Sequence, residues 1–597
     1  MVLFLLWSNI FCKSSSFQAE TTALDSTRCP SPCVCSYDYI EEYSIFCSLR
    51  HLSQVPELLP SSTRSLWLDG NNITRIPTGA FRNLSHLDFL NLQGSHVGSL
   101  EQHSLHGLKA LAHLHLERNM LKFLAPNTFL HTQNLVSLSL NNNFFTKIED
   151  GLFSGLSNLW YLNLGWNSLA VLPETVFHDL PNLRELILAG NRLVYLQTSL
   201  FLGLEELKEL DLSGNSLRGI KANVFTKQEK TFKLYLNHNQ ILTIAPRAFS
   251  SMKSLRWLDL SHNRLTGLHE DTFAGLISLS VLRLTNNSLT SLKPRIFKDL
   301  QFLVELNLMH NKIQVLLEKT FEGLVKLELL SLHHNNIQEI HQGSFSGLLN
   351  VAVINLSGNC LKSPPEYSFK GLATLHSLHM ESSCMSRIET HMFSGLVNVR
   401  RLFLQQNDIT LIDEYSFADL QELLELDLRS NRLSHITAKL FSGLNNLSYL
   451  LLSSNQILTI SSEAFIPVPK LQWLDLSNNQ LKTLTEENFL PMSSLRYLSL
   501  KNNFLKVLPI NFLSNVFPMQ QLWLNGNQWH CSCSLKGLRD FSLRNSSIVP
   551  RLVYSVSDGD EATNPVYNNI TCASPPETQG QDLRDLSEGH FTHCWSH

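Results

Sequence analysis

The stretch that decides the fold is Leu162-Asn163-Leu164-Gly165-Trp166-Asn167-Ser168-Leu169. It returns 24 residues later as Leu186-Ile187-Leu188-Ala189-Gly190-Asn191-Arg192-Leu193, and after 24 more as Leu210-Asp211-Leu212-Ser213-Gly214-Asn215-Ser216-Leu217. Followed outward in both directions, the asparagine position of this phrase recurs every 24 residues from 71 to 527, which makes twenty repeats. The residues that replace asparagine at this position are Ser95 and Ser383. One repeating unit therefore organises most of the 597-residue chain and takes precedence over any local motif.

The pattern L-x-L-x-x-N-x-L at this period is typical of leucine-rich repeats. Its leucines alternate with variable residues, which predicts a short strand in each repeat, with leucine facing inward and the variable positions exposed. Because each repeat contacts only its neighbours, the stacked strands should form a parallel sheet over a continuous core. The sequence therefore predicts an α/β-type solenoid, a leucine-rich repeat horseshoe of about twenty 24-residue repeats with capped ends, whose exposed strand positions form the concave face.

Two further positions of the repeat have structural explanations. The side-chain amide of the recurring Asn can satisfy backbone groups where the chain turns out of the strand. Ten residues after it, seventeen of the chain's 33 Phe residues share one repeat position, from Phe81 to Phe489. So many aromatic residues at one position predict a stacked spine on the far side of the core, and not seventeen binding groups.

The ends of the chain differ from the repeats and divide it into four regions. Residues 1–23 contain the apolar run Val2-Leu3-Phe4-Leu5-Leu6-Trp7 and are interpreted as a signal peptide, although no basic residue precedes this run. Residues 24–62 form a cysteine-rich N-cap, residues 63–528 the repeats, and residues 529–597 a cysteine-rich C-cap. No later segment has the apolar length that a membrane span needs, so we expect a secreted protein that is released and not tethered.

The cysteines indicate an oxidising compartment. Eleven are present, and removal of the signal peptide would leave ten, an even number. Cys360 and Cys384 occupy the same position in adjacent repeats, and stacked positions lie roughly 5 Å apart, which suits a disulfide. Two free buried thiols are the other interpretation of this pair. The remaining eight flank the repeats, where disulfide-bonded caps would cover the apolar ends of a solenoid, and a zinc site at Cys531 and Cys533 is the weaker alternative.

Seven N-x-S/T sequons occur, and seven in a secreted chain predict a glycoprotein. Their asparagines are Asn72, Asn83, Asn286, Asn355, Asn446, Asn545 and Asn569. The net charge of −4 is small for this length, and the sequence has no basic stripe, which argues against a nucleic-acid partner.

The exposed strand positions lie six, four and two residues before the asparagine, and they carry eleven acidic against five basic residues. One interpretation is that exposed strand positions simply need polar residues. The other is an acidic track for a basic partner segment, because a curved surface of one sign focuses the electric field and speeds encounter. A glycan at Asn355 would cover the middle of this face, so we favour contacts before Asn307 and after Arg401. The candidate partner-binding residues are Glu185, Glu209, Asp211, Asp259, Glu425, Asp427 and Asp475.

Aromatic residues share this face, including Tyr235 and Trp257. Such residues can be anchors of an interface, but they are also ordinary strand formers. No motif indicates catalysis, because P-loop, H-E-x-x-H and G-x-S-x-G patterns and sets with metal-ligand spacing are all absent from the sequence. We therefore expect a protein that is not an enzyme and has no cofactor and no metal site.

Several stretches resemble one family of serum glycoproteins, the acid-labile subunits of circulating insulin-like growth factor complexes. They include Leu164-Gly165-Trp166-Asn167-Ser168-Leu169-Ala170-Val171-Leu172-Pro173-Glu174 in the repeats and Tyr567-Asn568-Asn569-Ile570-Thr571-Cys572-Ala573-Ser574-Pro575-Pro576-Glu577 in the C-cap. Several matched residues are not consensus Leu or Asn, which makes the resemblance more specific than the repeat itself. It extends from Cys29 to Cys594. The chain departs from the family in its leader and between Tyr554 and Tyr567, where the family's pattern has two more cysteines.

The resemblance implies a serum protein that joins an insulin-like growth factor already held by binding protein three or five. The resulting ternary complex would be too large to leave the circulation quickly. The alternative is another secreted leucine-rich repeat binder, such as a matrix protein or a soluble receptor-like protein. Resemblance to capped solenoids also implies how the cap cysteines pair, since four cysteines alone allow three connectivities. The implied pairs are Cys29–Cys35, Cys33–Cys47, Cys531–Cys572 and Cys533–Cys594.

Overall fold

The computed structural model describes residues 29–37, 42–362, 364, 366–509, 519–554 and 565–595, so the predicted signal peptide lies outside the described residues. The chain forms two compact units. Unit 1 consists of Met1–Phe145 and Glu149–Leu162, and unit 2 of Thr146–Ile148 and Asn163–His597. Both are stacks of one repeated coil, so the fold is a solenoid, as the periodicity predicts.

Unit 1 begins with an antiparallel hairpin that leads into a parallel stack. β1 (Val34–Tyr37) pairs with β2 (Tyr43–Phe46), which runs parallel to the first repeat strand, β3 (Thr63–Trp67). The next repeat strands follow in parallel register, and a second ladder of two-residue strands pairs outside them. They are β5 (Phe89–Asn91), β7 (His113–His115) and β8 (Ser137–Ser139), with β4 (Arg75–Ile76) and β6 (Ser99–Leu100) outside. Unit 1 ends at Leu162 and unit 2 continues from Asn163, so the boundary falls within β9 (Tyr161–Asn163).

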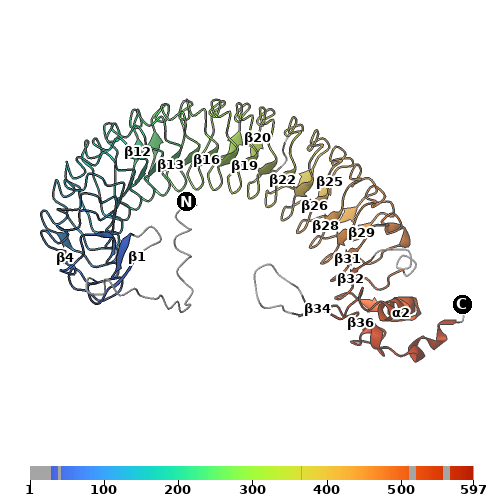
Figure 1. The fold of residues 1–597 in the computed structure, drawn as a ribbon. Helices are drawn as coiled ribbons and strands as arrows, with labels where there is room; N and C mark the ends of the chain where they lie inside the picture. The colour runs from blue at the N-terminus through green and yellow to red at the C-terminus, as the bar shows by residue number, and fades with distance from the viewer. Residues whose placement is uncertain are drawn as a thin grey trace. The chain divides into compact units, whose positions relative to one another are not determined.

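Unit 2 is a curved stack whose repeat strands line its inner, concave side (Figure 1). Each strand pairs in parallel with the equivalent residues 24 positions later, for example Glu209 with Lys233. These strands are β10 (Glu185–Ile187), β11 (Glu209–Asp211), β13 (Lys233–Tyr235), β15 (Trp257–Asp259), β16 (Val281–Arg283), β17 (Glu305–Asn307), β19 (Leu329–Ser331), β21 (Val353–Asn355), β22 (Ser377–His379), β24 (Arg401–Phe403), β26 (Glu425–Asp427), β28 (Tyr449–Leu451), β30 (Trp473–Asp475), β31 (Tyr497–Ser499) and β32 (Gln521–Trp523).

The rest of each repeat in unit 2 consists of turns and two-residue strands, because 24 residues leave little room for a helix after the strand and its turn. In the described repeats the exception is a 3₁₀ turn, η1 (Glu486–Asn488). The short strands pair from repeat to repeat as β12 (Gly219–Ile220) with β14 (Thr243–Ile244), β18 (Val315–Leu316) with β20 (Glu339–Ile340), β23 (Arg387–Ile388) with β25 (Leu411–Ile412), and β27 (His435–Ile436) with β29 (Thr459–Ile460).

The C-cap closes unit 2 with a helix and small sheets. η2 (Cys533–Leu535) leads into α2 (Lys536–Arg544), which buries Leu538. The remaining elements are β33 (Trp529–His530) parallel to β36 (Cys572–Ser574), β34 (Leu552–Tyr554) antiparallel to β35 (Pro565–Tyr567), η3 (Leu583–Asp585) and η4 (Glu588–Trp595). No helix among the described residues is long and apolar enough to cross a bilayer.

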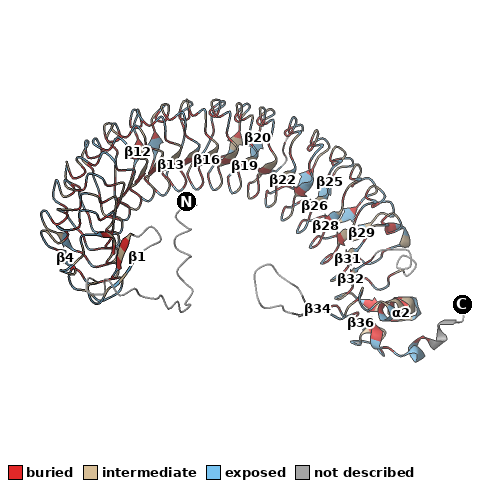
Figure 2. Ribbon diagram, viewed as in Figure 1, coloured by how far each residue is buried: buried red, intermediate tan, exposed pale blue. Residues whose placement is uncertain are grey.

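The core repeats as the sequence does, and buried residues recur in every turn of the ribbon in Figure 2. The strand leucines, such as Leu210 and Leu212, are fully buried. Behind them the Phe side chains stack on one another, with ring centroids 5.9 Å apart and planes 11° apart for Phe201 and Phe225. The Phe column is therefore the structural spine that its position predicts.

The recurring Asn acts as a backbone substitute. The Asn215 Nδ2 donates to the carbonyls of Leu188 and Leu212 at 3.0 Å each, and its Oδ1 accepts from the Leu193 N–H at 3.0 Å. One side chain thus satisfies groups in its own repeat and in the one before it, which a buried turn requires.

The residue before each Asn adopts a left-handed backbone conformation throughout the repeats, with φ between 52° at Asn286 and 73° at Gly526. Six of these twenty positions are glycine, for which this conformation is free of strain. The others include histidine, asparagine, serine, arginine and tryptophan, so the turn imposes its geometry on residues that disfavour it.

Disulfides lie in both caps, and one more disulfide links a pair of adjacent repeats. The structure joins Cys29 to Cys35, Cys33 to Cys47 and Cys531 to Cys572. Cys360 and Cys384 are bonded across adjacent repeats, with their Cα atoms 4.8 Å apart. Cys533 is also disulfide-bonded, and its implied partner Cys594 has no described side chain. Because Cys531 is in a disulfide, it is not a zinc ligand.

Candidate functional site

The strands of unit 2 place alternate side chains on the concave face. In β10, β11, β13 and β15 the central leucine is buried while the residue on either side is partly exposed. The side chains of the sequence-predicted track therefore lie side by side in columns that follow the stacking direction.

One group of predicted residues comes together in neighbouring strands, and we call Glu185, Glu209, Asp211 and Asp259 the acidic cluster. Glu185 is the register partner of Glu209 in the next strand. Partial burial, together with the charge of Glu209, raises the pKa of the Glu185 carboxyl. Within the described chain no ion pair is formed by Glu185, Asp211 or Asp259. These three carboxylates therefore carry negative charge that no direct ion pair neutralises, although Lys233 and Arg283 lie in neighbouring strands.

The two aspartates of this cluster also have a structural role. The Asp211 Oδ1 accepts from the Ser213 N–H at 2.9 Å, and the Asp259 Oδ1 accepts from the Ser261 N–H at 2.9 Å. Asn163 holds the equivalent N–H of its own repeat in the same way, at 3.0 Å. The hydrogen bond at the end of the strand needs only an oxygen, so the charge at this position is not required for the fold.

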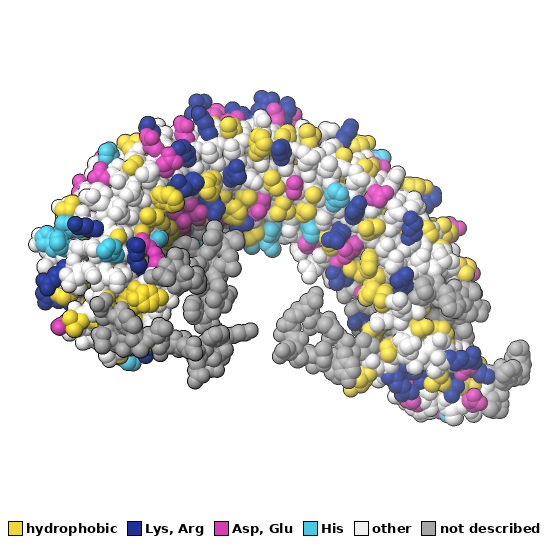
Figure 3. All heavy atoms as spheres, viewed as in Figure 1, with side chains coloured by type: hydrophobic (Ala, Val, Ile, Leu, Met, Phe, Trp, Pro, Cys, Tyr) yellow, Lys and Arg dark blue, Asp and Glu magenta, His cyan; other side chains and the backbone are white. Residues whose placement is uncertain are grey.

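Most basic residues of the concave face are paired with its carboxylates. The Lys233 Nζ lies 2.9 Å from Glu209, the Arg283 Nε 3.3 Å from Glu305, and the Arg401 Nε 3.9 Å from Glu425. The hydrogen bond from Lys233 to Glu209 raises the pKa of the lysine. Figure 3 views the molecule from one side, and on that visible side acidic and basic side chains are interspersed. The surplus of negative charge is thus confined to a few positions.

The second group of predicted residues is less available to a partner. The Asp427 side chain is only 1% exposed, and Arg429 binds it with the Nη2 at 2.6 Å. This hydrogen bond raises the pKa of the arginine. Glu425 faces Arg401, whereas Asp475 accepts the Ser477 N–H at 3.0 Å and forms no ion pair among the described residues. Asp475 is the residue of this group with free charge.

Aromatic side chains border the acidic cluster. Tyr235 and Trp257 lie in adjacent strands with ring centroids 6.5 Å apart, and the Arg283 guanidinium lies 4.4 Å from the Trp257 ring centroid. Partial burial raises the pKa of Tyr235, as does the charge of Glu209. Flat aromatic surface beside unpaired carboxylates can hold both the stems and the charges of Lys and Arg side chains.

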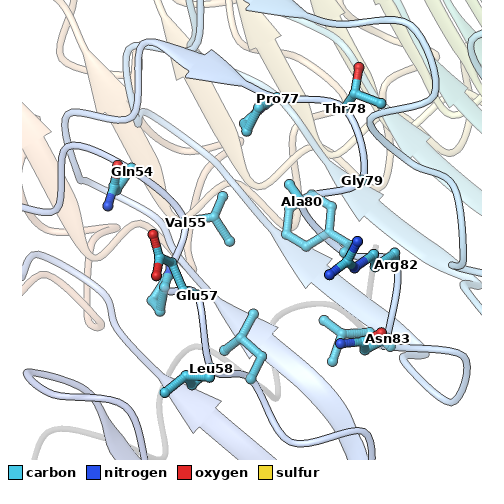
Figure 4. A pocket seen from close by; sticks show the side chains of 14 residues that line it. Gln54, Val55, Glu57, Leu58, Pro77, Thr78, Gly79, Ala80, Arg82 and Asn83 are labelled. Atoms are coloured by element: carbon cyan, nitrogen blue, oxygen red, sulfur yellow. The ribbon is translucent and has the colours of Figure 1, made fainter.

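A pocket in unit 1 offers no comparable chemistry (Figure 4). Its volume is about 470 Å3, and it lies between the Gln54–Leu59 segment and the Pro77–Leu84 turn. Glu57 and Arg82 are its charged residues, and Asn83, the asparagine of a sequon, also lines it. Across the described ranges, no group of three or more His, Cys, Asp or Glu side chains is placed to hold a metal ion.

The number of acidic and basic residues on the concave face does not by itself predict the ion pairs within that face. The signal was present in the sequence, because Lys233 follows Glu209, and Arg401 precedes Glu425, by one 24-residue repeat. Equivalent positions in adjacent repeats are neighbours, so opposite charges one period apart can pair. The spacing alone does not decide the partner, because Arg283, one period after Asp259, pairs with Glu305 instead.

The family model described as leucine rich repeat matches twelve overlapping stretches that together run from residue 61 to residue 528. Among curated proteins, the insulin-like growth factor-binding protein complex acid labile subunit of Papio hamadryas is 60% identical over 78 residues, and that of Homo sapiens is 59% identical over 78 residues. Each match covers 13% of this chain and 13% of the relative's length.

Solved structures resemble the chain over a longer range. The chain aligns with a structure of the Toll–Spatzle complex from Drosophila at 21% identity and a TM-score of 0.55, over 86% of this chain and 78% of that one. It aligns with the plant peptide hormone receptor RGFR1 in complex with RGF2 at 22% identity and a TM-score of 0.53, over 85% of each chain. At these identities the likeness supports the fold alone.

Proposed function

The chain belongs to the leucine-rich repeat family, and from that premise we propose that it is a secreted, non-enzymatic protein that binds a basic segment of a protein partner on its repeat strands. The observation that carries the proposal is the acidic cluster, in which Glu185, Asp211 and Asp259 lack ion-pair partners within the described chain. Carboxylates left unneutralised in the free protein favour a partner of opposite sign. Disulfides in both caps support an oxidising, extracellular compartment.

The similarity to acid-labile subunits extends the proposal to the partner. We infer that the partner is an insulin-like growth factor-binding protein of the three or five class that carries its growth factor, and that the ternary complex forms in serum. The 78-residue match supports this identity. The alternative is another secreted leucine-rich repeat binder, and the acidic cluster alone is compatible with both.

The mechanism is electrostatic steering followed by contact. Long-range attraction raises the rate of encounter, and Tyr235 and Trp257 then supply apolar area beside the ion pairs. Cations in contact with carboxylates lower their pKa in the complex, so the binding energy is present at neutral pH and is lost as pH falls through the carboxylate values. Burial already raises the pKa of Glu185 in the free protein, so this residue should lose its charge at a higher pH than an ordinary glutamate.

The test is binding of the full-length secreted protein to the binary growth factor complex. Asp211→Asn and Asp259→Asn remove the charge and keep the acceptor for the N–H at the end of the strand, as Asn163 does. We expect the variant with both Asn substitutions to lower the association rate roughly threefold. The variant with Asp211→Lys and Asp259→Lys should lower it roughly tenfold or more, because replacing charges at the rim of an interface acts mainly on the association rate. Glu487→Lys, at an exposed position in η1, is the control and should bind normally.

Two results would contradict the proposal at different levels. If both double variants bind like the wild type, and about 0.5 M salt leaves the association rate unchanged, the acidic cluster is not the contact. Tyr235 and Trp257 would then be the next residues to replace. The wild type could also bind basic peptides in a charge-dependent manner and fail to bind the binary complex. That result would contradict the proposed partner but would support the acidic cluster as a binding site for basic segments.

A further inference from the structure

Five consecutive repeats of unit 2 place a planar polar side chain at the same exposed position, the residue before the recurring Asn. We call His238, His262, Asn286, His310 and His334 the histidine ladder; all five are exposed. They follow the strands β13, β15, β16, β17 and β19 at the point where the chain turns away from the concave face.

The backbone fixes the spacing of the ladder. Each residue is left-handed, with φ between 52° and 55°. Each also donates its N–H to the next repeat: His238 to the Ser261 carbonyl at 3.0 Å, His262 to the Thr285 carbonyl at 2.8 Å, and His310 to the His333 carbonyl at 3.1 Å. The side chains therefore leave the chain in the same direction at every repeat.

The rings follow this geometry and stack. The His238 and His262 ring centroids are 4.1 Å apart with planes 9° apart, and those of His310 and His334 are 4.6 Å apart with planes 5° apart. Between the two pairs, the Asn286 Nδ2 lies 2.8 Å from the His262 Nδ1, so the amide donates and the imidazole nitrogen accepts. The ladder thus consists of two stacked pairs of rings, with Asn286 hydrogen-bonded to the first pair at the position between them.

Few negative charges face the ladder. Asp259 lies near His262, and Glu381 lies near His333, which adjoins the ladder together with His379. On the basic side, Arg264 and Lys312 follow the Asn of two of these repeats; both are exposed, and neither forms an ion pair within the described ranges. Arg283 is held by Glu305. Two unpaired cations therefore follow ladder residues by two positions in the described chain.

Neighbouring rings disfavour protonation at His262 and at the adjoining His333. Partial burial, with the adjoining His238, lowers the pKa of His262, and partial burial, with His334 and His310, lowers the pKa of His333. A ligand with several negative charges would remove this repulsion, because each imidazolium would face an anion. Anion binding and protonation thus favour each other.

We propose that the histidine ladder, with Arg264 and Lys312, is a binding edge for a linear sulfated polysaccharide that engages as the pH falls below neutrality. The row is one side chain wide and extends over five repeats, roughly 20 Å, which suits an extended chain with regularly spaced anionic groups. The proposal does not depend on the proposed function, because it uses other side chains of the opposite charge.

The experiment measures the affinity of the full-length secreted protein for a heparin oligosaccharide at about pH 7.4 and about pH 5.5. All proteins carry Ser288→Ala, which removes the sequon at Asn286 and keeps its amide. We expect the parent protein to bind roughly tenfold or more tightly at the lower pH. The quadruple variant H238N/H262N/H310N/H334N should lose most of this gain. Asn already occupies the same left-handed position at Asn142, Asn286, Asn478 and Asn502, so the variant should fold.

The matched control is His391→Asn. His391 is also left-handed, with φ 66°. It lies outside the ladder, eight residues after Ser383, which occupies the Asn position of its repeat, and its ring stacks on Tyr367. This variant should keep the full gain at low pH. The proposal is wrong if the parent protein shows no gain, or if the quadruple variant melts at the parent's temperature and retains it. Equal binding of fully desulfated heparin, or of phosphatidylserine vesicles, would also overturn it, because neither is a sulfated chain.

Discussion

At the scale of the residue, one recurring Asn side chain satisfies three backbone groups, as Asn215 shows. We expect Asn215→Leu to leave the carbonyls of Leu188 and Leu212 and the N–H of Leu193 without a partner, at a cost of about 1–3 kcal/mol. Secreted yield and the unfolding temperature should both fall, and partner binding should fall in proportion to the folded fraction. Ser216→Ala, one residue on, is the control. An Asn215→Leu protein that is secreted and melts normally but does not bind would instead identify Asn215 as a contact.

At the scale of the element, the C-cap is anchored on the last repeat by buried polar groups. Asn568 donates its Nδ2 to the Leu522 carbonyl at 2.9 Å, and Arg584 donates to the Asn568 carbonyl at 3.0 Å. Asp582 holds the Arg584 guanidinium with distances of 2.8 Å to the Nε and 2.7 Å to the Nη2. Asp582→Asn would leave the buried Arg584 charge uncompensated, so we expect a loss of about 3 kcal/mol or more in unfolding measurements at neutral pH.

The same substitution has a pH signature that distinguishes charge from packing. Burial alone would raise the pKa of Asp582, but the hydrogen bonds from Arg584 outweigh it and hold the pKa below the ordinary value. The stability that this carboxylate contributes is therefore present above the unfolded pKa of about 3.9, and it is lost as pH falls through the lower folded value. The difference in melting temperature between wild type and variant should shrink toward about pH 3. Asp585→Asn, at an exposed pair with Arg551, should change little, and a constant difference for Asp582→Asn would contradict the electrostatic account.

The elements also show what the sequence could and could not predict. Strands, leucine core, Asn turns and Phe spine were predictable, because every repeat places the same residue in the same environment. The left-handed turn was not, since Gly214, His238 and Trp166 share its backbone but no side-chain chemistry. The burial of Asp427 does not follow from its strand position, which it shares with the partly exposed Asp475; the difference lies two residues on, where Arg429 takes the place of Ser477.

At the scale of the whole molecule, the sequons differ in their surroundings. Asn72, Asn83, Asn286 and Asn569 are exposed. Asn446 and Asn545 are partly buried and donate their Nδ2 to the carbonyls of Gln421 and Phe541 at 2.9 and 3.1 Å, and Asn355 is partly buried on the concave face. We therefore expect glycans mainly at Asn72, Asn83 and Asn569, because the Asn286 Nδ2 is also held in a hydrogen bond, to the His262 Nδ1 at 2.8 Å. Peptide mapping after enzymatic removal of glycans in heavy-oxygen water would mark each used asparagine, and heavy labelling of Asn355 would contradict this expectation.

The disulfide between Cys360 and Cys384 joins equivalent positions of adjacent repeats and so ties off one repeat's length of chain. A molecule stretched between its ends in a force spectrometer would uncoil repeat by repeat, and each repeat would add about 80 Å of extension. The residues between Cys360 and Cys384 cannot extend under force while this disulfide is intact. The oxidised protein should therefore reach a full extension about 80 Å shorter than the protein treated with a reductant that opens this bond alone.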